Sequence, residues 1–247
     1  MDKMLFVTMS GAENTFLSQS LNANNLANVG TAGFKADLAQ FRSMPVMSKD
    51  SLPTRVYALT ERPATDFTPG PLMTTGRDFD VAIKGEGFFA VKSETNEDAY
   101  SRDGALQINE QGLLTNSRGL AVMGEGGEIN IPPAQKVEIG NDGSISFVPL
   151  GANPDAVVLL DRIKLVKPDI SNLEKGLDGL FYTKDNTVLS GNPDIKLAKG
   201  FLEGSNVNAV ESITNMISLS RQYEIQLKMI KQAEAIDEAS TSLLRVS

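Results

Sequence analysis

Long amphipathic helices are predicted at both ends of the chain, over residues 1–29 and 208–244, because apolar residues recur there at steps of three and four. Near the N-terminus they form a narrow, heptad-like stripe that only Gln19 interrupts: Leu5, Met9, Ala12, Phe16, Ala23 and Leu26. Near the C-terminus the stripe comprises Val210, Ile213, Met216, Leu219, Tyr223, Leu227, Ile230 and Ala233. An isolated amphipathic helix is marginal in water, so both apolar faces have to be covered. The helices are therefore expected to pair with each other, to pack on the rest of the chain or to contact other subunits.

Local signals predict where these helices begin and end. Asn28 and Gly30 tolerate the left-handed conformation at a helix C-terminus. Asn208 is a good N-cap, and Glu211 three residues later completes a pattern similar to a capping box. At about 1.5 Å per residue, the two helices would be roughly 40 Å and 55 Å long.

The sequence between the helices has a different pattern. Over residues 36–75 the helical period is absent and five prolines would break a helix, which predicts a long irregular arm: Pro45, Pro53, Pro63, Pro69 and Pro71. From about residue 76 the period becomes two, and Phe79, Val81 and Ile83 are predicted on the inner face of a half-buried strand. Residues 157–160 are all apolar and are predicted as a fully buried strand. Short strands separated by glycine turns indicate an antiparallel β-domain.

The predicted fold class is therefore α+β. The long N- and C-terminal helices are expected to pair as an α-helical coiled coil, with a mostly antiparallel β-domain inserted between them. The predicted divisions are an N-terminal assembly helix and motif over 1–35, an extended irregular arm over 36–75, a β-rich domain over 76–200 and a C-terminal assembly helix over 201–247.

Composition argues against several classes of function. The net charge is −8, and no Lys/Arg cluster is dense enough to bind a phosphate backbone, so no nucleic-acid partner is expected. The chain contains no Cys and no His, which removes thiolate nucleophiles, imidazole bases and the usual zinc ligands, so no cofactor or metal is expected. No stretch approaches the roughly 18 apolar residues of a membrane span, so no direct membrane insertion is expected. The apolar run over residues 4–7 is too short for a secretory signal peptide.

The remaining carboxylates and hydroxyls do not form a catalytic pattern. Asp78 and Asp80 share the polar face of the predicted strand, which indicates a solvated surface. Glu86 lies in a Gly-Glu-Gly turn that is not a strand-to-helix junction, so a phosphate loop is not indicated. Ser101 has no His with which to form a triad. The chain is predicted not to be an enzyme and to have no catalytic residues.

Four segments resemble one protein family. Residues 23–35, Ala-Asn-Asn-Leu-Ala-Asn-Val-Gly-Thr-Ala-Gly-Phe-Lys, are similar to the N-terminal motif of bacterial flagellar rod and hook proteins. Gly30 stands where that family more often has a polar residue. Residues 100–106 resemble the Tyr-Ser-Arg-Asp-Gly hairpin of the family, residues 109–114 the turn that follows it, and residues 203–208 the segment that opens its C-terminal helix. The start of the chain, residues 51–55 and the short length look most like the proximal rod members, with a distal rod or hook-type subunit as the alternative.

The resemblance implies a self-assembling structural subunit of the rod, the drive shaft that transmits torque from the motor to the hook. It implies that the terminal helices form an inner tube and that the partners are other rod proteins, proximal and distal, together with copies of the same chain. It also implies export through the flagellar type III apparatus without a cleaved signal peptide, and a place in the periplasmic part of the basal body. A very different alternative is a periplasmic enzyme acting on cell-wall polymer, which would need a pair of carboxylates in a cleft.

The predicted assembly interface combines the helical stripes with the motif residues. It comprises Leu5, Met9, Ala12, Phe16, Asn24, Asn25, Leu26, Asn28, Phe34, Asn206, Val210, Ile213, Met216, Tyr223, Leu227 and Ile230. Further apolar residues outside these stripes favour additional contacts with neighbouring subunits: Leu17, Leu21, Ile217, Ile225 and Met229. Two interpretations of the asparagines at 22, 24, 25 and 28 remain: they cap and turn the chain locally, or they donate hydrogen bonds across subunits.

Overall fold

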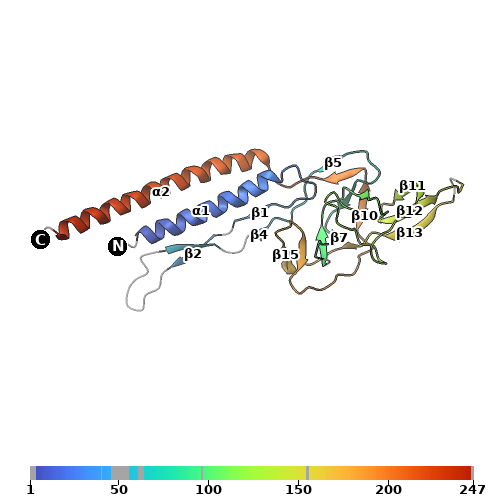
Figure 1. The fold of residues 1–247 in the computed structure, drawn as a ribbon, viewed down its shortest axis with the longest axis horizontal. Helices are drawn as coiled ribbons and strands as arrows, with labels where there is room; N and C mark the ends of the chain where they lie inside the picture. Colours follow the sequence, from blue (N-terminus) through green and yellow to red (C-terminus); the bar gives the residue numbers. More distant parts are fainter. Residues whose placement is uncertain are drawn as a thin grey trace. The chain divides into compact units, whose positions relative to one another are not determined.

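The computed structural model describes residues 4–39, 41–45, 56–60, 64–95, 97–153 and 156–245. Within these residues it contains two α-helices, α1 (Met4–Ala27) and α2 (Ala209–Arg245), with short strands between them in sequence (Figure 1). Neither helix, over its described residues, is long and apolar enough to cross a membrane. The chain forms two compact units. The first comprises Met1–Val29, Ala36–Asp66 and Val207–Ser247, and the second comprises Gly30–Lys35 and Phe67–Asn206.

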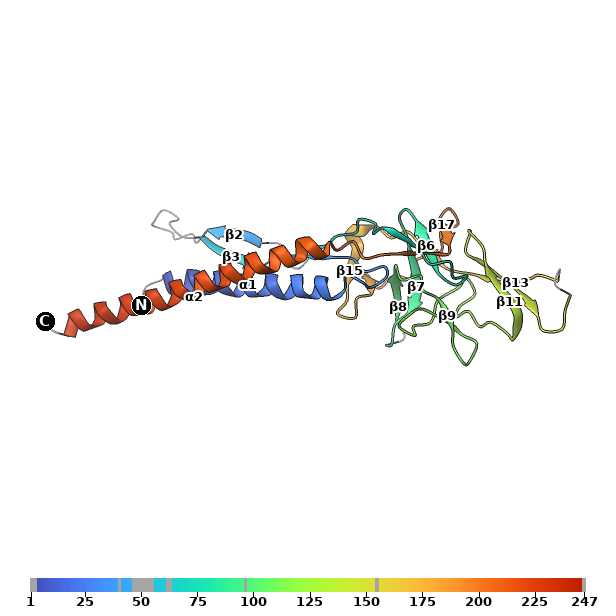
Figure 2. The ribbon, with the colours of Figure 1, turned by 90° about the horizontal axis from the view of Figure 1, so that it is seen from above.

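In the first unit, α1 and α2 lie side by side and run antiparallel (Figures 1 and 2). The Asn22 amide donates a hydrogen bond of 2.7 Å to the carbonyl of Ser212, and the Thr15 hydroxyl donates one of 3.2 Å to the Gln226 side chain. These two contacts join the end of α1 to the start of α2, and the middle of α1 to the middle of α2.

The start of α2 confirms the predicted N-cap. The Asn208 side-chain oxygen accepts hydrogen bonds from the backbone N–H groups of Val210 at 3.1 Å and Glu211 at 3.4 Å. A helix leaves its first N–H groups without partners inside the helix, and this oxygen supplies two of them with an acceptor.

The buried side of α1 overturns the predicted coiled coil. It carries small and polar residues instead of an apolar seam: Thr8, Ala12, Asn14, Thr15, Ser18 and Asn25. Their hydroxyls are satisfied within the helix, as when Thr15 donates to the carbonyl of Gly11 at 2.9 Å. Met9 and Phe16, which the predicted seam would have buried, are exposed. The predicted fold class is therefore wrong: two helices pair and a β-rich domain lies between them in sequence, but α1 offers α2 no stripe of large apolar side chains to interlock with.

Short strands complete the first unit. β1 (Asp37–Leu38) pairs with β4 (Ala64–Thr65), and β2 (Phe41–Pro45) pairs with β3 (Val56–Thr60), both antiparallel. Both β1 and β3 contact α1. These strands lie in the stretch for which an irregular arm is predicted. Because residues 40, 46–55 and 61–63 of that stretch are outside the described residues, its boundaries stay a prediction.

The second unit is built from antiparallel strands. A five-stranded sheet has the order β14 (Leu165–Val166), β7 (Phe88–Lys92), β8 (Asp98–Ser101), β16 (Phe181–Thr183) and β15 (Leu173–Lys175). A three-stranded sheet has the order β11 (Ala134–Ile139), β12 (Ser144–Pro149) and β13 (Val158–Arg162). Three pairs complete the unit: β10 (Leu114–Thr115) with β9 (Gln107–Ile108), β17 (Lys196–Lys199) with β6 (Val81–Lys84), and β18 (Phe201–Glu203) with β5 (Leu72–Thr74). A short 3₁₀-helix spans Ile170–Asn172.

Three details of this unit differ from the pattern in the sequence. Residues 81–83 of β6 are buried on both faces, so the strand is not half-buried as the alternation predicts. Asp80 is buried as well, whereas Asp78 stays exposed, so the two carboxylates do not share a solvated surface. The predicted buried strand at 157–160 is wrong, because Val157 and Leu159 are 61% and 68% exposed. Among the residues that the structure describes, β13 is the edge strand of its sheet and pairs with β12 alone.

Candidate assembly surface

The predicted interface residues of the two helices fall into two groups. Met9 and Phe16, each 61% exposed, lie on the outside of α1 together with Phe6. Val210, Ile213 and Leu227 are exposed on α2. The remaining helix residues of the set are buried or half-buried between or beside the helices: Leu5, Ala12, Leu26, Met216, Tyr223 and Ile230. The first unit therefore leaves large apolar side chains of both helices in contact with solvent.

The helix pair brings two of the predicted aromatic residues together. The rings of Phe16 and Tyr223 lie with their centroids 6.3 Å apart and are tilted by 45°. This separation is within the range of favourable aromatic pairs. The contact lies at the margin of the helix pair, because Tyr223 is half-buried while Phe16 stays exposed.

The asparagines at the end of α1 make contacts within the chain. Asn25 is buried, and its amide both donates to the carbonyl of Asp37 at 2.8 Å and accepts from its N–H at 2.9 Å. Asn28 donates to the carbonyl of Asn24 at 2.9 Å. Asn24 itself is exposed. The Asn28 contact turns the chain locally, whereas the Asn25 contact joins two segments twelve residues apart. Asn24 stays accessible for a contact outside the chain, so both interpretations of the asparagines stay predictions.

Phe34 and Asn206 belong to the second unit, where they lie together. The backbone N–H of Asn206 donates to the carbonyl of Phe34 at 3.4 Å. The Asn206 amide also donates to the carbonyl of Thr68 at 3.2 Å, and the Lys175 ammonium lies 4.0 Å from the centre of the Phe34 ring. Both residues are thus engaged at the place where the two chain ends enter the second unit.

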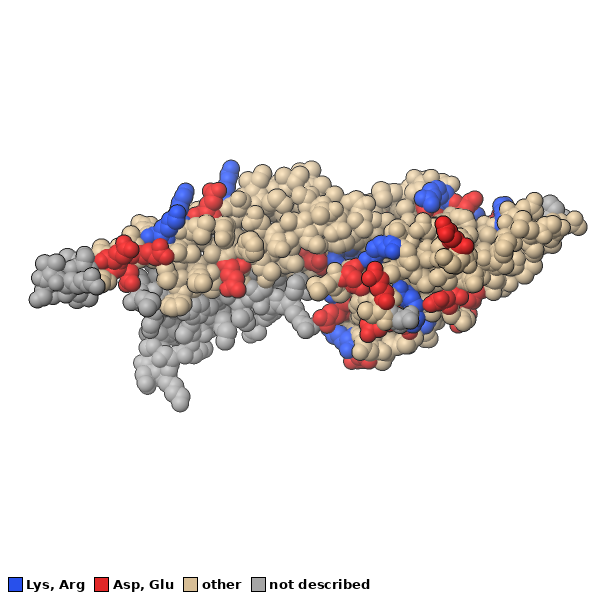
Figure 3. Space-filling model, viewed as in Figure 1, with Lys and Arg blue, Asp and Glu red and all other residues tan. Residues whose placement is uncertain are grey.

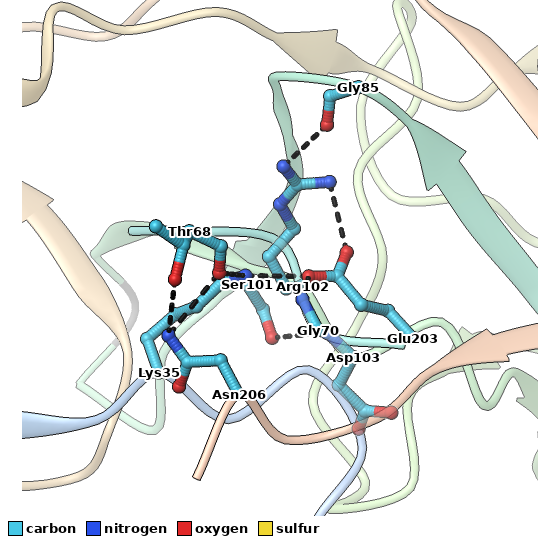
Figure 4. A network of polar contacts seen from close by, with 9 residues as sticks. All are labelled: Lys35, Thr68, Gly70, Gly85, Ser101, Arg102, Asp103, Glu203 and Asn206. Carbon is cyan, nitrogen blue, oxygen red and sulfur yellow. Dashed lines mark hydrogen bonds and ion pairs between the residues drawn. The ribbon is translucent and has the colours of Figure 1, made fainter. Parts of the chain in front are cut away.

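A buried charge network of Lys35, Arg102 and Glu203 links the segments that carry Phe34 and Asn206. Figure 4 shows the Glu203 carboxylate between two cations, with Lys35 Nζ at 2.6 Å and an Arg102 guanidinium nitrogen at 3.1 Å. All three side chains are at least 97% buried. Lys35 also donates to the carbonyl of Thr68 at 2.8 Å, and the backbone N–H of Gly70 donates to Glu203 at 3.1 Å.

The geometry of this network explains how buried charges are tolerated. Arg102 forms an ion pair with Glu203 and donates a hydrogen bond of 2.6 Å from its other terminal nitrogen to the carbonyl of Gly85. Burial lowers the pKa of the Arg102 guanidinium below its ordinary value, and the negative charges of Glu203 and Glu86 oppose that shift. The shared carboxylate and one backbone carbonyl for each cation offset the cost of burying these charges, although Nε and Nη1 of Arg102 have no hydrogen-bond partner among the described residues.

Backbone packing at the network requires a glycine. The N–H of Gly33 donates to the carbonyl of Glu203 at 2.8 Å, and Gly33 adopts a φ of +68°. A Cβ atom on Gly33 would lie 2.3 Å from the carbonyl carbon of Arg102. Any other residue would both strain the backbone and collide with the hairpin.

Sequence reasoning did not predict this network, although each of its members was in view. Lys35 closes the 23–35 motif, Arg102 lies in the 100–106 motif and Glu203 opens the 203–208 motif. The available signal was that three segments far apart in sequence resemble the same family, and that two of them carry a cation and the third an anion that could pair with both. The other charged residue of the hairpin, Asp103, has a local role instead: its carboxylate accepts hydrogen bonds from the N–H of Ala105 and the hydroxyl of Ser117.

The other carboxylates form no catalytic or metal-binding group. Asp78 pairs with Lys199 at 3.6 Å, and Glu86 pairs with Lys167 at 2.9 Å on the surface. The hydrogen bond and the charge of Lys167 lower the pKa of the Glu86 carboxyl. Among the described residues, no three acidic side chains are grouped so that they could hold a metal ion.

Comparison with known proteins places these features in one family. Residues 82–147 match the family model described as flagellar hook protein FlgE/F/G D1 domain, and residues 198–243 match the one described as flagellar basal body rod FlgEFG protein C-terminal. The flagellar basal-body rod protein FlgF of Salmonella typhimurium is 36% identical over 253 residues, which cover 100% of both chains. The FlgF protein of Caulobacter vibrioides is 33% identical over 250 residues, which cover 99% of this chain and 98% of the relative.

A rod protein with another name is similar over most of its length. The flagellar basal-body rod protein FlgG of Buchnera aphidicola subsp. Schizaphis graminum is 32% identical over 255 residues, covering 93% of this chain and 95% of the relative. These alignments take in both terminal helices and the charge network. The chain therefore belongs to the family of flagellar basal-body rod proteins and is most like its FlgF members.

Proposed function

We propose that this subunit is held in the flagellar rod by the outward faces of α1 and α2, and that through them it carries torque from the motor toward the hook. The observation that supports this role is an exposed helix surface that is apolar and nearly free of charge. Glu13 is the only charged residue among residues 4–27, and Phe6, Met9 and Phe16 all lie on the outside of the helix.

The distribution of charge on α2 supports the same conclusion. Glu211 is the only charged residue among residues 205–220, whereas residues 221–238 carry both acidic and basic side chains. On the face seen in Figure 3, the charged residues of α2 gather toward its C-terminal end, and none is seen on the first turns at its N-terminal end. Covering a large apolar side chain contributes about 1.5–3 kcal/mol, so the exposed residues supply a strong drive for association.

The neighbours that fit such a surface are other rod subunits with helices of the same kind. We propose that they include further basal-body rod proteins and other copies of this chain. We also propose a periplasmic place in the basal body and export by the flagellar type III apparatus without a cleaved signal peptide. Exposed apolar helix faces tend to associate. This favours export of the chain directly to the growing rod over build-up of free chains that would aggregate.

A charge placed on the outward face tests this function. Leu227→Asp should keep the chain folded, because Leu227 is 40% exposed, but should prevent its incorporation into basal bodies and abolish swimming. Leu227→Met, which keeps an apolar side chain at the same position, is the matched control and should leave swimming intact. Basal bodies isolated from cells that express only the variant would be probed for the chain. Normal incorporation of the Leu227→Asp chain would contradict the proposal.

A further inference from the structure

Among the exposed apolar residues of the helix pair, two groups lie on opposite flanks. The line of α2 that faces α1 is marked by its contacts: Ser212 with Asn22, Gln226 with Thr15, and Tyr223 with Phe16. The less exposed residues of α2 continue this line at steps of three and four: Ser212, Met216, Leu219, Tyr223, Gln226, Ile230 and Ala233.

Beside this line, the second half of α2 carries an apolar patch. Ile225, Met229 and Ile236 are all exposed, and at about 100° per residue they lie about 100° to one side of the line. We call them the α2 patch. Leu227 and Lys231 lie on the other side of the line. The two flanks of α2 therefore differ in chemistry along the same stretch of helix.

The outside of α1 carries a complementary stripe. Phe6, Met9 and Phe16 lie about 110–190° around α1 from the line through Thr15 and Asn22, which contacts α2, and we call them the α1 stripe. The ring contact between Phe16 and Tyr223 places this stripe on the flank of α2 that carries Leu227 and Lys231. The α1 stripe and the α2 patch thus lie on opposite flanks of one helix pair.

The two surfaces match in length and in charge. The ends of the α1 stripe are ten residue steps apart and those of the α2 patch eleven, which correspond to about 15 Å and about 17 Å. Glu13, the only charge of α1, lies within the stripe between Met9 and Phe16. Arg221 and Lys228 border the α2 patch and are exposed. A neighbour that covers the stripe has to supply a cation near Glu13, and the patch of this same chain does so.

We propose that the α1 stripe of one copy docks on the α2 patch of a second copy of this chain. The contact joins two different surfaces, so each copy uses its stripe toward one neighbour and its patch toward the next. A head-to-tail contact of this kind generates a ring or a helical array, whereas a self-complementary contact would end at a dimer. The proposal rests on the proposed function, since it specifies which neighbours cover the outward helix faces in the rod.

Single cysteines provide the test, because the chain contains none of its own. A Met9→Cys chain and a Met229→Cys chain, each with a different tag, would be expressed together in a motile strain in place of the native chain. Isolated basal bodies would be treated with a short bis-maleimide. The expected product is a mixed dimer that carries both tags. Lys231→Cys is the matched control, exposed and two residues from Met229 but on the other flank, and with Met9→Cys it should give no mixed dimer.

Each other result overturns the proposal in a distinguishable way. Dimers between two Met9→Cys chains, or equal yields with Met229→Cys and Lys231→Cys, would show a different contact between copies. Thiols that are protected from labelling in basal bodies but form no mixed dimer would show that another rod protein covers these surfaces. Both results would leave the proposed function intact. Absence of all tagged chains from basal bodies of swimming cells would instead overturn the proposed function, and this contact with it.

Discussion

Glu203 links the first and the last segment of the second unit, residues 30–35 and 201–206. Its carboxylate contacts Lys35 from the N-terminal motif and Arg102 from the hairpin motif, and its own strand leads toward α2. The three residues are separated by 67 and 101 positions along the chain, so their contact closes long loops. Such a network restricts how the segments 30–35 and 201–206 can leave the second unit.

Glu203→Gln should destabilise the second unit by about 3–5 kcal/mol, because Lys35 and Arg102 would stay buried without a negative partner. Differential scanning calorimetry of the full chain would show the loss as a lower unfolding temperature. Glu86→Gln, which breaks a surface pair with Lys167, is the control and should leave the transition in place. Equal transitions for the two variants would mean that the buried pair contributes no more than the exposed one.

At the scale of the element, the side of α1 that contacts α2 is largely polar. The contact side of α1 carries small polar residues such as Thr15 and Ser18, while Phe6, Met9 and Phe16 are exposed. Burial of a large apolar side chain at this contact would stabilise the helix pair more than these polar groups do. The helices can therefore pair within one chain and still present their apolar faces to neighbours.

Gln226→Leu should strengthen the helix pair by roughly 1 kcal/mol, since it buries apolar surface while the Thr15 hydroxyl keeps its bond to the carbonyl of Gly11. Hydrogen exchange of the free chain should show slower exchange of the amides in both helices. Gln222→Leu, on the exposed side of α2, should leave these rates unchanged. Faster exchange in Gln226→Leu would mean that the amide is needed for pairing.

At the scale of the molecule, the two units have different sources of stability. The second unit has a contiguous core of buried apolar residues, including Phe89, Leu114 and Ile145, in addition to the charge network. The first unit is held by short strands and by the helix contact, in which polar side chains of α1 meet partly buried apolar residues of α2. Membership of the rod protein family confirms that the chain is a structural protein and not an enzyme, so this difference concerns assembly and not catalysis.

Limited proteolysis of the purified chain should first cleave the first unit and leave a fragment from about residue 30 to about residue 206. The fragment should begin before residue 36, because Gly33 and Lys35 are bonded to Glu203. Mass spectrometry would identify its ends. Resistance of the whole chain would show that the helices are already stably folded without neighbouring subunits, and would contradict this prediction.

Much of this protein follows from its sequence alone. The helical period predicts both terminal helices, Asn208 predicts where α2 begins, and the motifs at 23–35, 100–106 and 203–208 indicate the family. These features depend on residues close together in the chain, or on patterns that relatives share. The sequence also predicts that apolar residues such as Met9 and Leu227 need a partner.

Only the tertiary structure decided which surface each residue meets. A heptad-like stripe in the sequence does not determine which side of the helix faces its partner. The coiled coil predicted from Met9 and Phe16 is wrong because both side chains are exposed. Residues 157–160 form an apolar run in sequence, yet their strand lies at a sheet edge with only one neighbouring strand. In the sequence, Lys35, Arg102 and Glu203 look like ordinary surface charges. In the folded chain, Lys35 and Arg102 both have a nitrogen within 3.1 Å of the Glu203 carboxylate. Burial and charge pairing arise from contacts between distant segments, and these contacts form only when the whole chain folds.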